Sequence, residues 1–122
     1  MSLQYLDFDY SEDAHGHGSF EAMASVPESR LPALHAEIAQ VLDWAFAAFP
    51  GQRAPMEEGG EWDYLLHGQQ EWTAPESLIY DEVARRFSRQ LGTTGAPRHM
   101  LTISISGSAQ FCEAFRRGFA VG

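Results

Sequence analysis

The stretch from Leu31 to Phe49 constrains the fold of this chain more than any other. Ser29 is the expected N-cap before it and Pro50-Gly51 the expected stop after it. A helix of this length cannot cover its own apolar stripe, so the rest of the chain must supply a sheet or further helices. The stripe follows from spacings of three and four between its apolar residues, which are Leu31, Leu34, Ile38, Val41, Leu42, Ala45 and Phe49.

Four other segments alternate apolar and polar residues, as strands with one buried face do. Residues 3–10 and 19–26 flank a Gly-rich turn and predict a hairpin with a loose tip. Residues 61–70 predict a third strand. The clearest strand is His99–Ser106, where Leu101, Ile103 and Ile105 alternate with polar residues and Met100.

Residues 73–91 fit two structures. Thr73 and Glu76 form a capping-box signature, and Ile79, Val83 and Phe87 follow at intervals of four, which predicts a helix. A long strand is the alternative, because residues four apart also share a face at a period of two. A last helix is predicted after Gly107-Ser108, with phenylalanines and Cys112 on its buried side.

Together these segments predict one α+β domain over residues 1–122, in the order ββαβαβα. We expect a two-layer sandwich in which a four-stranded, mainly antiparallel sheet carries the helices on one face. A chain of this length buries enough surface for a core without a disulfide or a metal. The single cysteine, Cys112, excludes an internal disulfide, and no segment resembles a leader or a membrane span. We therefore expect a cytoplasmic protein with no membrane contact.

Charge is distributed unevenly along the chain. Residues 1–82 carry sixteen of the seventeen acids and two arginines, a formal −14, whereas residues 83–122 carry six arginines and one acid, a formal +5. A surface this acidic repels nucleic acid, so we do not expect DNA or RNA as a partner. We predict a protein-interaction or inhibitor module that binds a basic protein through an acidic surface; an acidic face that only keeps the protein soluble is the alternative. The candidate partner-binding residues are Asp7, Asp9, Glu57, Glu58, Glu61 and Asp63.

A small enzyme or ligand-binding protein is the second hypothesis. If Leu6, Phe20, Trp62 and Ile103 face the helices, polar side chains from four strands share the outer face of the sheet. A carboxylate beside a histidine on a rigid sheet can perform general acid–base catalysis. An ordinary solvated face or a dimer contact explains the same pattern, so a homodimeric structural protein is the third hypothesis. The catalytic candidates are Asp7, Asp63 and His67.

The tip of the first predicted hairpin holds His15 and His17 near Asp13. Imidazole and carboxylate donors suit zinc or nickel. Structural zinc sites bring four donors on a rigid frame, whereas this turn is rich in glycine, so we expect no metal here. The sequence contains no phosphate loop or dinucleotide fingerprint, and no cofactor is predicted.

Overall fold

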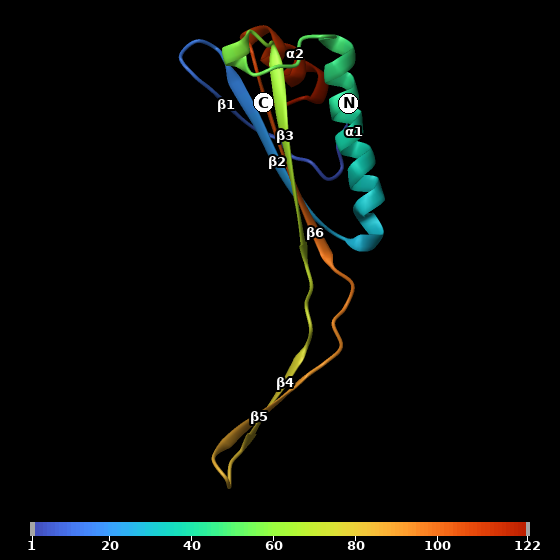
Figure 1. Cartoon of the computed structure of the whole chain (residues 1–122), viewed down its shortest axis with the longest axis vertical. Helices are drawn as coiled ribbons and strands as arrows, with labels where there is room; N and C mark the ends of the chain where they lie inside the picture. Colours follow the sequence, from blue (N-terminus) through green and yellow to red (C-terminus); the bar gives the residue numbers. More distant parts are fainter. Residues whose placement is uncertain (1, 122) are drawn as a thin grey trace.

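The chain has a body at one end and a long β-hairpin at the other (Figure 1) in the computed structural model, which describes residues 2–121. The body contains a four-stranded sheet in the order β1-β2-β6-β3, antiparallel at every pairing. This confirms the predicted α+β class and the antiparallel sheet. The four strands are β1 (Asp9–Glu12), β2 (Gly18–Pro27), β6 (Arg98–Gly107) and β3 (Trp62–Glu71).

Two helices, α1 (Leu31–Ala48) and α2 (Ala109–Phe119), cover one face of the sheet (Figure 1). Within residues 2–121, neither is long and apolar enough to cross a membrane. The predicted cap at Ser29 is wrong, because Ser29 lies in the short helix η1 (Glu28–Arg30) and α1 starts without a side-chain cap. Helix α2 does have a cap: the Ser108 hydroxyl accepts a hydrogen bond from the Phe111 N–H at 3.2 Å.

The core lies between the helices and the inner face of the sheet. Trp62 on β3 and Phe111 on α2 stack with ring centroids 5.6 Å apart and an interplanar angle of 3°. Phe20, Trp62 and Ile103 are buried on the helix side, which confirms the predicted sidedness of the sheet; Leu6 is also buried, but it lies outside the strands.

The predicted strand over residues 3–10 is wrong in extent, because the first strand pairs only over Asp9–Glu12. The buried carboxylate of Glu37, on α1, explains why the preceding segment needs no strand neighbour. Its Oε2 accepts the backbone N–H groups of Tyr5 and Leu6, both at 2.9 Å, and its Oε1 accepts that of Gln4. These backbone donors are satisfied by a side chain instead of a ladder.

The helix predicted over residues 73–91 is also wrong. This segment forms a hairpin of β4 (Glu76–Asp81) and β5 (Arg86–Leu91), so the element order is ββαββββα. The Asp81 carboxylate builds the turn by accepting the N–H groups of Val83 and Ala84, both at 3.0 Å. The alternative prediction of one long strand is correct in that the segment is extended, but the chain reverses within it and forms two strands.

Candidate functional site

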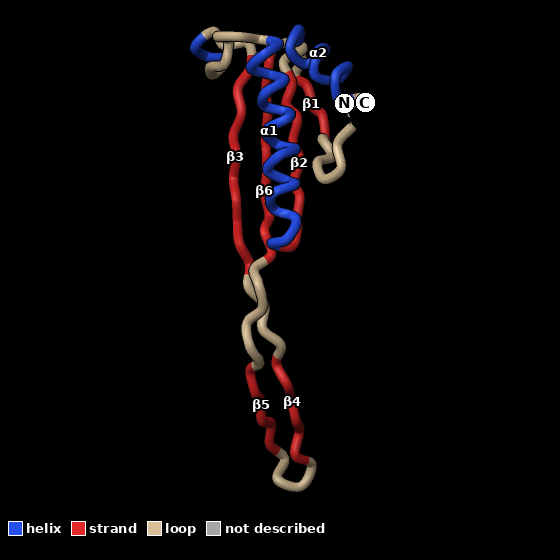
Figure 2. Tube along the Cα trace, turned by 90° about the vertical axis from the view of Figure 1, so that its right-hand side faces the viewer, coloured by secondary structure: helices blue, strands red, loops and turns tan. Residues whose placement is uncertain are grey.

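The most unusual part of the molecule is the arm, which we define as residues 72–97. It projects from the end of the body along the long axis of the molecule (Figures 1 and 2). Every residue from Leu65 to Ala96 is exposed. Backbone hydrogen bonds from Gly92 to Pro75 (2.7 Å) and from Gly95 to Thr73 (3.0 Å) join its two limbs near the base. An isolated two-stranded hairpin is marginally stable in water, so the arm has little stability of its own.

One face of the arm is apolar. In the β4–β5 register Tyr80 lies opposite Phe87, with ring centroids 5.1 Å apart. An ion pair between Glu76 and Arg89, with Oε2 and Nη1 3.8 Å apart, lies on the same face. Because side chains alternate along a strand, the other face carries the remaining residues, which are polar except for Ile79. The apolar face comprises Leu78, Tyr80, Phe87 and Leu91.

A groove runs beside the sheet in the body. Helix α1 lies over β2 and β6 (Figure 2) and leaves β3 exposed from Leu65 onward, whereas Trp62 packs against Phe46 of α1. Two cavities of about 340 and 600 Å³ follow this uncovered strip, and both are lined by His35, Gly68 and Leu101. Leu66 and Phe46 are exposed beside it. We call this strip the α1–β3 groove; its main apolar residues are Leu31, Ile38, Ala39, Leu42, Leu66 and Leu101.

The groove leads to the base of the arm. Trp72, the first residue of the arm, lines the larger cavity together with the buried His99. The Nε2 atom of His99 has no hydrogen-bond partner and lies 3.6 Å from the Glu28 carboxylate. The arm and the groove therefore follow one another along the same side of the molecule.

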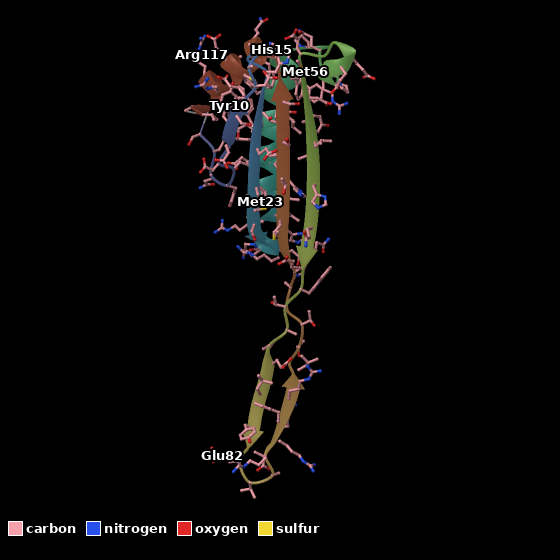
Figure 3. The ribbon with its side chains drawn as sticks, turned by 90° about the vertical axis from the view of Figure 1, so that its left-hand side faces the viewer. Tyr10, His15, Met23, Met56, Glu82 and Arg117 are labelled. Atoms are coloured by element: carbon pink, nitrogen blue, oxygen red, sulfur yellow. The ribbon has the colours of Figure 1, made fainter. Side chains whose placement is uncertain are left out.

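The catalytic candidates do not come together. Asp63 and His67 both lie on the outer face of the sheet, opposite Ser106 and Thr102 in the register; Figure 3 shows this face, with Met23 labelled on it. They are four residues apart on one strand, which separates them by roughly 13 Å. The Asp63 carboxylate instead pairs with Arg53, with Oδ1 and Nε 2.8 Å apart.

Asp7 belongs to a different region. It lies in the segment before β1 and lines a cavity of about 430 Å³ with Phe8 and Phe119. The Asp63 ion pair lies on β3, at the opposite edge of the sheet from β1. The structure therefore offers no shared position at which Asp7, Asp63 and His67 would contact one substrate.

The predicted acidic surface divides into two groups. Asp9 is on β1, and Asp63 is on β3, three strands away across the sheet, roughly 14 Å. Glu61 accepts a hydrogen bond from the Ser108 hydroxyl. Glu57 and Glu58 are exposed on the short helix η2 (Met56–Glu58), which precedes β3 (Figure 1). Met56 of η2 lines a cavity with Ser19 and Ser106, so η2 lies at the end of the sheet where β2 and β3 begin, on the side of its outer face.

The predicted metal candidates form an ordered turn. Asp13 Oδ1 accepts the backbone N–H groups of His15 at 2.8 Å and of His17 at 3.0 Å. The hydrogen bond from the His15 backbone, followed by that from His17, lowers the pKa of the Asp13 carboxyl. Within residues 2–121, no three His, Cys, Asp or Glu residues are grouped so as to hold a metal ion. Asp13 thus organises the backbone of the tip.

Cys112 is a buried core residue, as predicted. Burial raises the pKa of its thiol, which keeps the sulfur protonated at neutral pH. The nearby Tyr10 hydroxyl donates a hydrogen bond to the Glu12 carboxylate at 2.7 Å, and this bond with burial raises the pKa of Tyr10 to about 12. Both groups are neutral near pH 7, which argues against a nucleophilic role for either.

Sequence reasoning did not identify the arm and the α1–β3 groove as candidate functional surfaces. A usable signal was present: exposed stretches rarely carry as many large apolar residues as Leu78, Ile79, Tyr80 and Val83. Comparison of the chain with protein-family models, curated proteins and solved structures gives no match.

Proposed function

We propose that this protein is a protein-interaction module that binds another chain through the apolar face of its arm. The observation that carries the proposal is the arrangement of Leu78, Tyr80, Phe87 and Leu91, exposed side by side on a hairpin outside the core. Exposed apolar clusters of this kind mark interaction sites in folded proteins. Covering them contributes roughly 25 cal/mol for each Å² removed from water.

Charge adds a second element to the proposal. The arm contains three acids and three arginines and is formally neutral, whereas the rest of the chain has the whole net charge of −9. The acidic body attracts a partner with basic groups and repels an acidic one. We therefore expect a partner surface that is apolar and flanked by arginine or lysine.

Catalysis by the outer face of the sheet has weaker support. The Asp63 carboxylate is engaged by Arg53 at 2.8 Å, and His67 is too far along β3 to exchange a proton with it directly. An interaction surface needs no such pair. The arm is thus the better-supported functional element.

Site-specific photo-crosslinking in the producing cells tests this function. A benzophenone amino acid replaces Tyr80 on the apolar face, and in the matched control it replaces Ser88 on the opposite face of the same hairpin. We expect a crosslinked product from position 80 and little from position 88. Absence of any product from position 80, with the protein folded and abundant, would contradict the proposal, whatever the identity of the partner.

A further inference from the structure

We propose that the partner is a second copy of this chain, and that each copy lays its arm in the α1–β3 groove of the other. This inference rests on the proposed function of the arm. One chain carries both an exposed apolar ribbon and an apolar groove lined by Ile38, Leu42 and Leu66. A two-fold dimer covers both surfaces at once, because each copy gives an arm and receives one.

The arm is long enough to cover the groove. One limb of the arm, residues 73–81, spans roughly 30 Å at the rise of a β-strand. The groove follows β3 from Leu66 to Gln70, roughly 17 Å, and α1 from Leu31 to Leu42, roughly 18 Å. The hairpin can therefore lie along the whole groove.

The direction of the arm fixes the orientation of the two copies. The groove leads to Trp72 and the arm continues away from it (Figure 2). A copy rotated by 180° about an axis perpendicular to the long axis presents its own groove beside the arm of the first. The arm tip then lies at the far end of the partner groove, near the start of β3, and the contact is closed, so no filament grows.

Charge limits how two copies can meet. Two bodies of charge −9 repel each other, so a contact between copies is most favourable through the neutral arm. Arg85 and Arg86 are exposed near its tip. In the rotated arrangement they approach the end of the partner's body that carries η2, where Glu57 and Glu58 are exposed. Asp81 and Glu82 lie in the same tip, so the arm adds apolar contact to the acidic body without adding net charge.

The surface is also large enough. The arm has 26 residues, and a standard protein interface uses roughly 20–30 residues from each partner. About half of the arm residues face one way, roughly 13, and about twelve other residues line the groove, so each copy contributes roughly 25 residues. This amount of contact is typical of stable dimers.

Light scattering of the purified, untagged protein gives the first measurement, and we expect twice the chain mass of 13.6 kDa. The second is crosslinking of the variant Leu66→Cys/Leu78→Cys with a short bis-maleimide. These residues are roughly 40 Å apart within one chain, because twelve residues of extended strand separate them. A groove-to-arm link therefore forms only between two copies.

The controls separate this contact from others. The single variants Leu66→Cys and Leu78→Cys report links between identical sites of two copies. The variant Leu66→Cys/Ser88→Cys places the second thiol on the polar face of the arm. The wild type shows how much product the buried Cys112 gives. We expect the product of Leu66→Cys/Leu78→Cys to exceed that of every control at least fivefold. Peptide mapping should find the thiol introduced at position 66 joined to the thiol introduced at position 78.

A monomeric mass at high protein concentration overturns this proposal, and so does a dimer without the link between positions 66 and 78. Neither result decides whether the arm binds another protein, because the photo-crosslink at Tyr80 tests that function separately and reports contact with any protein. A product of that probe with a different chain would support the interaction module and refute the homodimer.

Discussion

Tyr80 and Phe87 face each other across the β4–β5 ladder with ring centroids 5.1 Å apart, yet the residues remain 45% and 72% exposed. Such an aromatic pair stabilises a hairpin by about 0.5–1.5 kcal/mol beyond its burial. The pair therefore helps to shape the arm, while most of its apolar surface remains available to another chain.

Leu78 and Ile79 allow a matched test of the apolar face. They are neighbours on β4 with exposures of 63% and 64%, but they point to opposite faces of the arm. Leu78→Ser should raise the dimer dissociation constant about 30-fold or more, as expected for a buried contact at an interface. Ile79→Ser should change it less than about threefold. Sedimentation equilibrium measures both constants.

Both variants should unfold at the same denaturant concentration as the wild type when compared as monomers, because neither residue touches the core. Equal weakening by the two substitutions would contradict a one-sided contact. In that case the arm contributes to assembly only through its overall structure.

The acids of η2 give an electrostatic prediction. Glu57→Lys/Glu58→Lys should weaken the dimer, because the substituted side chains approach Arg85 and Arg86 of the other copy. The effect should shrink as salt rises, since these charges are exposed and screened. Sedimentation at low and at high salt measures it. A control at the other sheet edge, Asp9→Lys, should have a smaller effect; a larger effect there would place the contact on the β1 side.

Glu37 gives a prediction for the body. Glu37→Ala should lower the free energy of unfolding by about 2–4 kcal/mol, because the N–H groups of Tyr5 and Leu6 lose their acceptor near the core. Glu37→Gln keeps an acceptor oxygen and should lower it by less. Denaturant unfolding measures both changes. A loss below about 0.5 kcal/mol for Glu37→Ala would show that another group satisfies these donors.

The tip of the β1–β2 hairpin should not bind zinc tightly. The Asp13 carboxylate already accepts hydrogen bonds from two backbone N–H groups, so His15 and His17 would have to bind the metal with little contribution from it. Calorimetric titration of the untagged protein should show no site tighter than roughly 10 µM, because two exposed imidazoles lose much of the binding energy to ordering. Tight binding that His15→Ala/His17→Ala abolishes would contradict this expectation.

The body of the protein could be predicted well from local patterns. The stripe of α1 and the alternation in β2, β3 and β6 persist over ten or more residues. Over that length the helical period of 3.6 residues and the strand period of two are easily distinguished. Phe20, Trp62 and Ile103 were placed on the correct face for the same reason. Long periodic segments determine both the element and its buried side.

The arm could not be predicted, because its pattern fits two periods. Ile79, Val83 and Phe87 are four apart, which suits a helical stripe as well as a strand. The reversal of the chain depends on Asp81 and on Arg85 at φ 57°, without the glycine or proline that marks most turns. The candidate sites were harder still, since Asp7 and Asp63 lie at different edges of the sheet and only the strand order shows it.

Hydrogen exchange in the arm tests the central claim most directly. A two-stranded hairpin exposed to water opens easily, whereas one packed in a groove exchanges slowly. We predict that amides of β4 and β5 are protected in the wild type at high concentration, and that dilution or Leu78→Ser removes this protection while β6 stays unchanged. Complete exchange of the arm at the shortest labelling time, at every concentration, would contradict the account.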